Sequence, residues 1–546
     1  MTRSSHRTGR ARRATLSCVL AAALAAASLT AAGTPAGAKA GNAPRNGGSI
    51  VFALEAENDL TNGYCLPRAQ LAAAGIQVTT AIYDTLVTQN SKGEYVPFLA
   101  KSVTPNADNT EWTLEIRDGI KFHDGTPLDA DAVKLNIDSY RGANPRVSSP
   151  LGTLTFRDID SVTVTGPLTV VVKTKVPWVD FPAFLYGTGR PGMVAPAQLN
   201  DQSTCSRNPI GTGPFKFVEW RPNEQLVVER NPDYWRKGLP HLDKITFKPV
   251  TEAAQRVNGL EAGDYDVIQT SSSKSISELE QKSRSGDIRL TVSDRGSETA
   301  YLMLNTSKPP FDDMLARKAV AYAGDADQVN NIINKGLNRI ATGPFPPDNP
   351  AYLPKRPLEH NLKKAKKLVK EYEQKHGQPL TFEYLTGPEP ELVQIAELVQ
   401  EQQGKAGIKV SVRNVDQAEL IDEALAGNFQ GAGWRNHPGG DPDTQYVWWH
   451  SGLPTNFGRI KDPEVDRLLE AGRSEPDPAK RTQIYKDLNR HFARELYNLW
   501  SWWTLWAVGT ANDIRGVNGA PLPDKEGKPF PVFAGVIPVS GLYKTK

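Results

Sequence analysis

The pattern between residues 380 and 412 restricts the fold of this chain more than any other sequence feature. An apolar run at Leu380–Leu385 is followed by a helical stretch at Glu391–Gln403 and by a second apolar run at Ile408–Val412. Two strands joined through a helix run parallel, and helices then cover the faces of the sheet. The pattern therefore predicts an α/β fold for this part of the chain.

The first half of the chain shows antiparallel patterns instead. Residues Trp112–Ile116 alternate between apolar and polar side chains, and Phe215–Trp220 and Gln225–Arg230 flank a turn at residues 221–224. Such alternation predicts half-buried strands, and two strands around a short turn predict a hairpin. We therefore expect mixed sheets in the complete fold.

The first forty residues are typical of a secretory signal peptide. The segment combines a basic start that ends at Arg12-Arg13, an Ala/Leu-rich run at Val19–Ala32 and a small-x-small site at Ala38-Lys39-Ala40. The run is shorter than the roughly 20 apolar residues that span a bilayer. The sequence predicts export, cleavage near Ala40 and a soluble mature chain.

The route of export and the mode of anchoring depend on two details of this segment. Arg12-Arg13 is compatible with a twin-arginine signal, but Thr15 stands where that signal prefers an apolar residue, so the general secretory route stays open as well. Cys18 precedes the apolar run rather than following it. We therefore expect a released protein that carries no lipid anchor.

Removal of the signal changes the charge of the chain. The full sequence has 64 basic and 61 acidic residues, and the signal holds six of the basic residues. The mature chain thus has 58 basic and 61 acidic residues, a net charge of −3. This balance does not predict a nucleic-acid partner.

The mature length and the cysteine content set further limits. About 500 residues exceed the 250–300 that one hydrophobic core usually holds, so we expect more than one domain. Cys65 and Cys205 are the two cysteines that follow the signal. Because disulfides persist outside the cytoplasm, we expect these two cysteines to pair.

Motifs of catalysis are absent from the sequence. It contains no Gly-x-Ser-x-Gly elbow, no His-Glu-x-x-His and no phosphate-binding loop. Ser271–Lys274 forms a Ser-x-x-Lys pattern without the partner motifs of that class of enzyme, and we interpret it as a polar loop. His437 and His450 have no histidine or cysteine at a metal-ligand spacing, so we expect no metal site and no cofactor.

Several ordered segments resemble the family 5 solute-binding proteins, which are the peptide- and nickel-binding receptors of bacterial ABC importers. The resemblance covers nearly the whole mature chain in the right order. The segments that carry it are Ile82–Val87, Val96–Ala100, Gly119–Leu128, Pro209–Phe215, Asn231–Trp235, Leu304-Asn305 with Pro309–Asp313, and Asn456–Asp466.

The resemblance implies a periplasmic-binding-protein-like α/β fold with several lobes and a hinged ligand cleft. It also implies an ABC permease and its ATPase as partners, and we expect a monomer. The expected division is a signal peptide at 1–40, lobe I at 41–87, 200–297 and 500–546, lobe II at 88–199 and lobe III at 298–499. The segments Tyr301–Asn305 and Leu499–Trp506 would connect lobes I and III at the hinge.

The resemblance places the ligand site near Gly433–Asp443. In family members that bind peptides, a Trp lines the cleft and an Asp three residues later binds the α-ammonium group. An acidic residue and a Pro follow that Asp in the family. Trp434 and Asp441-Pro442 match the Trp and the acidic-Pro pair, whereas Asn436 and His437 stand near the position of the ammonium-binding Asp. Either Asp441 takes over that role or the ligand has no free amine there.

Further ligand contacts are expected from Arg435, which suits a carboxylate, and from three residues that follow the first strand. The three residues are Glu57, Asn58 and Tyr64. The sequence thus predicts a receptor for a peptide or peptide-like solute. Two alternatives stay open, a receptor for a metal chelate or a small metabolite, and a secreted binding protein that is not coupled to transport.

The expected pairing of Cys65 with Cys205 predicts the result of a thiol assay. Labelling of the denatured, unreduced mature protein should detect no free thiol, and labelling after reduction should detect both. Two labelled thiols without reduction would rule the pairing out.

Overall fold

The strand–helix–strand unit is present with the parallel pairing that its pattern predicts. Its strands β15 (Thr381–Thr386) and β16 (Lys409–Asn414) pair in parallel, and α11 (Pro390–Ala406) connects them. The helix begins with a proline in its first turn, where the missing N–H group costs no hydrogen bond. It ends at Gly407, whose φ of +94° favours glycine.

The computed structural model describes residues 44–58, 60–69, 71–436 and 440–545. The expected signal peptide and its cleavage site lie outside these residues, as does His437. Among the helices of the described part, none is long and apolar enough to cross a membrane. The described chain is built on three larger sheets.

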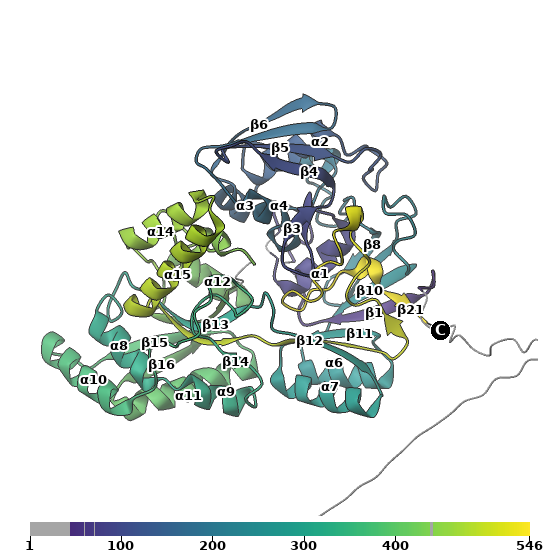
Figure 1. Ribbon diagram of the computed structural model, residues 1–546. Helices are drawn as coiled ribbons and strands as arrows, with labels where there is room; N and C mark the ends of the chain where they lie inside the picture. The colour runs from purple at the N-terminus through teal and green to yellow at the C-terminus, as the bar shows by residue number, and fades with distance from the viewer. Residues whose placement is uncertain (1–43, 59, 70, 437–439, 546) are drawn as a thin grey trace, which may run out of the picture. The chain divides into compact units, whose positions relative to one another are not determined.

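The first sheet has seven strands and combines residues from both ends of the chain (Figure 1). Its centre is β1, which pairs in parallel with β10 and β11, while β19 joins antiparallel to β11. Helices α6 (Ala253–Ala262) and α7 (Ser273–Ser285) lie side by side against β11 and β12. From edge to edge the strands are β12 (Arg289–Ser293), β19 (Trp506–Thr510), β11 (Val267–Thr270), β1 (Ser49–Leu54), β10 (Lys244–Pro249), β9 (Gln225–Arg230) and β8 (Phe215–Arg221).

The second sheet is antiparallel and has four strands. The strand predicted at Trp112–Ile116 lies inside it, with Trp112 and Leu114 buried. Its strands are β4 (Ala100–Pro105), β5 (Glu111–Ile116), β7 (Thr169–Thr174) and β6 (Ile159–Gly166). Nearby in sequence are the helices α2 (Ala130–Tyr140), α3 (Pro150–Thr155), α4 (Phe181–Tyr186) and α5 (Pro196–Asn200).

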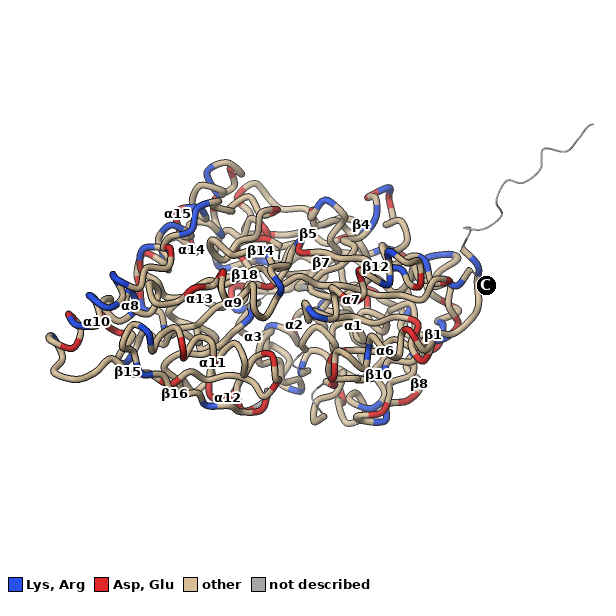
Figure 2. The backbone as a smooth tube through the Cα atoms, turned by 90° about the horizontal axis from the view of Figure 1, so that it is seen from below, with Lys and Arg blue, Asp and Glu red and all other residues tan. Residues whose placement is uncertain are grey.

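The third sheet has six strands and contains the strand–helix–strand unit. Its order is β14 (Arg339–Ile340), β18 (Asn498–Trp503), β13 (Thr299–Leu304), β17 (Gly431–Asn436), β15 and β16. The chain segments around it form α8 (Met314–Ala323), α9 (Ala326–Ile333), α10 (Leu362–His376), α12 (Gln417–Ala426), α13 (Tyr446–Trp449), α14 (Pro463–Ser474) and α15 (Pro478–Glu495). Helix α10 buries Ala365 and Val369 and carries its lysines on exposed positions, which Figure 2 shows as blue segments along it.

The crossings between the first and third sheets differ from the expected hinge. Tyr301–Asn305 does not lie between the sheets, because Tyr301 to Leu304 belong to β13. Leu499–Trp506 begins inside β18 but contains the second crossing. The chain passes from the first sheet to the third through residues 294–298, between β12 and β13, and returns through residues 504–505, between β18 and β19. The expected boundary between lobe III and the last segment of lobe I, at residues 499/500, therefore falls inside β18. The end of β18 could not be recognised in the sequence, because the tryptophans on both sides of it are buried. These residues are Trp502, Trp503 and Trp506.

Three shorter elements complete the part of the fold that bears on the site. Helix α1 (Ala73–Ile82) precedes the two-stranded pair β2 (Val87–Gln89) and β3 (Tyr95–Pro97). The side chain of Gln77 donates to the carbonyl of Ile537 and accepts from its amide, at 3.1 and 2.8 Å. The C-terminal segment is thereby held against α1. A second small pair, β20 (Ile514–Arg515) with β21 (Tyr543–Lys544), closes the end of the chain.

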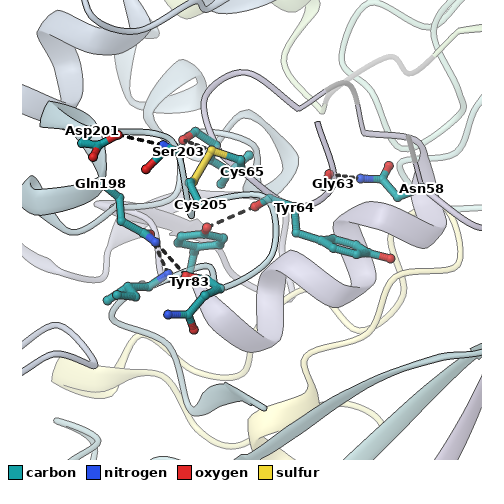
Figure 3. Close-up of a disulfide and its surroundings, with 12 residues drawn as sticks. Asn58, Gly63, Tyr64, Cys65, Tyr83, Gln198, Asp201, Ser203 and Cys205 are labelled. Carbon is teal, nitrogen blue, oxygen red and sulfur yellow. Dashed lines mark hydrogen bonds between the residues drawn. A yellow bond between two sulfur atoms is a disulfide. The ribbon is translucent and has the colours of Figure 1, made fainter. Parts of the chain in front are cut away.

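Cys65 and Cys205 are joined by a disulfide across 140 residues of sequence. Figure 3 shows the bond beside Tyr83, whose hydroxyl donates to the carbonyl of Tyr64 at 3.1 Å. The four-stranded sheet lies entirely within the loop that the disulfide closes. Closing such a long loop lowers the entropy of the unfolded chain and so stabilises the fold.

A buried ion network links the second sheet region to α14. Arg473 is 3% exposed and pairs with Asp443, which is fully buried, at 3.1 Å and with Asp158 at 2.5 Å. The indole N–H of Trp178 donates to the second oxygen of Asp443 at 2.8 Å. The guanidinium group also lies 3.7 Å from the centre of the Tyr446 ring. The buried Arg473 thus has carboxylate partners on two sides, and Asp443 accepts from both Arg473 and Trp178.

We expect Arg473→Met to destabilise the protein by about 3–5 kcal/mol, because it leaves a buried carboxylate without its cation. The control Arg490→Met removes a half-exposed pair with Asp487 and should cost less than about 1 kcal/mol. Denaturant titration of both purified variants measures the difference. Equal midpoints for the two variants would contradict the importance of the buried network.

Candidate functional site

Trp434 lies on β17, in the middle of the third sheet. Its backbone faces that of Tyr301, and its half-buried ring packs edge-on against Phe457, with 5.3 Å between ring centres. The small hollow beside it is also lined by Trp448 and Met303, and its volume is about 10 Å³. Such a hollow has room for about one water molecule. Trp434, Trp448 and Phe457 thus form an aromatic wall, and their side chains already fill most of the space beside Trp434.

Arg435 points to the opposite face of β17 because side chains alternate along a strand. One guanidinium nitrogen lies 3.6 Å from the carboxylate of Glu298 and 3.4 Å from the hydroxyl of Ser271. Ser271 directly follows β11, so Arg435 reaches from the third sheet to the first. Its side chain is 40% exposed, whereas that of Glu298 is 8% exposed.

Carboxylates gather around this arginine. Attraction to Glu298 raises the pKa of Arg435 above its ordinary value, and three further acidic groups act in the same direction. Burial raises the pKa of Glu55, although Arg435 opposes that shift. The acidic groups are Glu55, Glu298, Glu389 and Glu391.

None of these four residues was among the residues expected from the sequence. One signal existed, since Glu55 directly follows β1 and ligands of open α/β sheets bind beyond the carboxyl ends of the strands. The other three come from separate segments that only the fold brings together.

Asp441 is fully engaged within the protein. Both of its carboxylate oxygens accept hydrogen bonds from the guanidinium group of Arg481, and one of them also accepts from the amide of Asp443 at 2.8 Å. Burial alone would raise the pKa of Asp441, but Arg481 outweighs burial and holds it below the ordinary range. Asp180 is hydrogen-bonded to the same carboxylate, and burial together with that negative neighbour raises the pKa of Asp180 well above its ordinary value. An ammonium group could bind Asp441 only by displacing these partners.

Two residues of the expected site lie at the edge of the described chain. Asn436 ends β17, where its backbone faces Thr299. His437 lies outside the described residues. The chain resumes at Gly440, where a side-chain carbon would come within 2.6 Å of the Tyr95 hydroxyl and 2.7 Å of the Gln89 amide nitrogen. This close approach, together with a φ of +86°, explains the glycine.

Glu57, Asn58 and Tyr64 form a separate cluster with structural partners of their own. One oxygen of Glu57 accepts from the Tyr64 hydroxyl at 3.1 Å, and the other accepts from the amide of Asn223 at 2.9 Å. Asn58 is buried and donates to the carbonyl of Gly63. The structure does not bring these three residues into contact with Trp434 or Arg435.

A cavity of about 110 Å³ lies between α1, β2 and the C-terminal segment. Asp84 forms part of its wall and is 7% exposed. Its two oxygens accept from the indole N–H of Trp235 at 2.9 Å and from the hydroxyl of Tyr234 at 3.3 Å. Burial raises the pKa of Asp84 from 3.8 to about 7, although these donors and Arg236 oppose the shift.

No group of three or more metal-ligating side chains occurs among the residues that the structure describes.

Comparison with known proteins gives a consistent assignment. The family described as "Bacterial extracellular solute-binding proteins, family 5 Middle" matches residues 94–458, more than half of the chain. The glutathione-binding protein GsiB of Pectobacterium atrosepticum is 27% identical over 424 residues, which cover 75% of this chain and 80% of that protein. GsiB of Escherichia coli K12 is 27% identical over 427 residues, with the same two shares.

Solved structures show the same fold at low sequence identity. DppA from Helicobacter pylori in complex with the peptide STSA has a TM-score of 0.80 at 22% identity, over 92% of this chain and 99% of that chain. AgaA from A. tumefacien R10 in complex with agropinic acid has a TM-score of 0.79 at 23% identity, over 91% and 99%. AppA from Bacillus subtilis in complex with a nonapeptide has a TM-score of 0.78 at 22% identity, over 92% and 100%.

The raised pKa of Asp84 predicts a specific dependence of stability on pH. Because the folded protein holds the proton more tightly than the unfolded chain, the Asp84 contribution to stability is present below pH 4 and is lost as the pH rises to about 7. Asp84→Asn keeps a neutral side chain of the same shape. Its free energy of unfolding should therefore increase relative to the natural protein across this range, by up to about 4 kcal/mol.

Urea unfolding of both proteins between pH 4 and 8 measures this difference. Tyr234→Phe serves as the matched variant, since it removes one hydrogen bond to Asp84 but keeps the carboxyl group. It should retain the pH dependence. A difference between Asp84→Asn and the natural protein that stays constant from pH 4 to 8 would refute the assignment to Asp84.

Proposed function

The chain belongs to the family 5 bacterial extracellular solute-binding proteins, and from this premise we propose that it captures a peptide or peptide-like solute and delivers it to a membrane permease. The mature protein starts near residue 41, carries no lipid anchor and acts as a monomer. Its partners are the permease and ATPase of an ABC importer. The protein has no catalytic role of its own.

Two observations support a peptide-like solute. The fold matches that of DppA in complex with a peptide and that of AppA in complex with a nonapeptide. The segment around Trp434 also resembles that of peptide-binding members of the family, in which a Trp lines the cleft. Non-peptide cargo is the second candidate, since AgaA in complex with agropinic acid has the same fold.

The pairing of Asp441 with Arg481 supports a mode of binding in which this carboxylate does not contact the solute. A charged hydrogen bond to a peptide ammonium group contributes roughly 1.5–3 kcal/mol, but it needs an available carboxylate. Both oxygens of Asp441 are bound to Arg481. The segment after Trp434 therefore holds its solute without an ammonium–Asp441 pair.

Isothermal calorimetry with trialanine and N-acetyltrialanine tests this mode of binding. We expect dissociation constants within about threefold of each other, because acetylation removes a charge that Asp441 does not recognise. A loss of tenfold or more on acetylation, about 1.4 kcal/mol, would show an ordinary ammonium site. Trp434→Ala should weaken both peptides alike, and Gln374→Ala on the exposed face of α10 should weaken neither.

Mass spectrometry of solute carried through gentle purification separates the two candidate cargoes. Peptide ions are the expected result. A non-peptide metabolite in their place would replace the peptide in this proposal and leave the receptor role intact.

A further inference from the structure

The cavity between α1 and the C-terminal segment contains a buried polar atom without a partner. Gln89 is 3% exposed, and its side-chain nitrogen donates to the carbonyl of Gly93 at 3.0 Å. Its side-chain oxygen has no hydrogen-bond partner among the described residues, and Gln89 lines the cavity. A buried acceptor without a partner costs about 1–3 kcal/mol, so a donor that reaches this oxygen from the cavity is favoured.

The remaining walls are mainly apolar and are held in place. Ile76, Tyr186, Phe530 and Phe533 contribute carbon surface. The C-terminal segment that closes the cavity is held at two points. Gln77 is hydrogen-bonded to Ile537, and the amide of Phe530 donates to the backbone carbonyl of Gln89 at 2.9 Å. A cavity that exists before binding requires little ordering when a ligand enters.

The charged groups of the wall already have partners within the protein. Both oxygens of Asp84 accept hydrogen bonds from Tyr234 and Trp235. Arg236 lies close enough to Asp84 to interact with its charge, and its guanidinium group also donates to the carbonyl of Pro521. A charged ligand would lose its water shell in this cavity and would gain a counter-ion only by displacing these partners, which is unfavourable. A neutral ligand avoids that cost.

The volume of the cavity limits the class of ligand further. An apolar cavity of about 150 Å³ binds benzene, and this cavity, at about 110 Å³, is smaller. It therefore suits a branched group of three or four carbon atoms that carries one N–H or O–H donor.

The cavity also lies next to the segment that follows Trp434. The backbone of Gly440 approaches the amide group of Gln89 so closely that a side-chain carbon there would come within 2.7 Å of its nitrogen. Gln89 thus contacts both the cavity and the end of the expected ligand segment. A solute at that segment would have one of its groups near Gln89.

We propose that this cavity is a specificity pocket for a small, neutral, branched group of the solute that donates one hydrogen bond to the side-chain oxygen of Gln89. The assignment of this group to the transported solute depends on the proposed function. The pocket itself does not, because small probe molecules report on it directly.

Two probes of matched shape test the pocket. 2-Methylpropanamide offers an N–H donor, whereas 2-methylpropanenitrile has the same branched carbon skeleton and no donor. Ligand-observed NMR titration of the mature protein should show that the amide binds at least tenfold more tightly than the nitrile. Gln89→Met should remove this preference, and the control Gln374→Met should keep it.

A second variant covers the case in which Gln89→Met does not fold. Ile76→Phe fills the cavity from α1 and should abolish binding of both probes while thermal unfolding stays cooperative. Equal binding of the two probes by the natural protein, or no binding of either, would overturn the proposal. A preference for the amide that persists in both Gln89→Met and Ile76→Phe would also overturn the proposal. If the natural protein prefers the amide to the nitrile but binds no tripeptide, the pocket is supported and only the peptide cargo is rejected.

Discussion

The segment that follows Trp434 depends on a buried pairing of two carboxylates with two guanidinium groups. Asp441 is bound to Arg481, and Asp443 is bound to Arg473, which also reaches Asp158 beside the second sheet. These contacts join the third sheet's helices to a separate sheet. They also occupy both carboxylate oxygens of Asp441, so the proposed site offers no available carboxylate at this residue for a peptide amine.

The sequence could predict the local elements because their signals are local. Apolar periodicity and flanking turn residues predicted β5, the β8–β9 hairpin and the β15–α11–β16 unit, and the structure confirms all three. The first crossing between sheets was expected at Tyr301–Asn305 and lies a few residues earlier, whereas the segment expected for the second, Leu499–Trp506, contains the crossing but begins inside β18. Consecutive buried tryptophans look alike on either side of such a crossing, and only strand pairing shows that β18 extends to Trp503.

The sequence indicated a segment for the candidate site but not the contacts that its residues make. The segment from Trp434 to Asp441 was recognised, yet the role of Asp441 depends on Arg481, which lies forty residues away in the sequence on α15. Glu298 and Glu391 belong to unrelated segments and meet Arg435 only after folding. Glu57 and Tyr64 had a plausible position after β1, but their partners come from the β8–β9 hairpin and from each other.

The disulfide between Cys65 and Cys205 gives the chain an unusual connectivity. The whole four-stranded sheet lies between the two cysteines, so this part of the molecule is a covalent ring rather than an open insertion. A protease that cuts one exposed loop inside the ring leaves both new ends tied to the rest of the protein. For a protein that works outside the cell, a single cut there does not separate the lobe from the receptor.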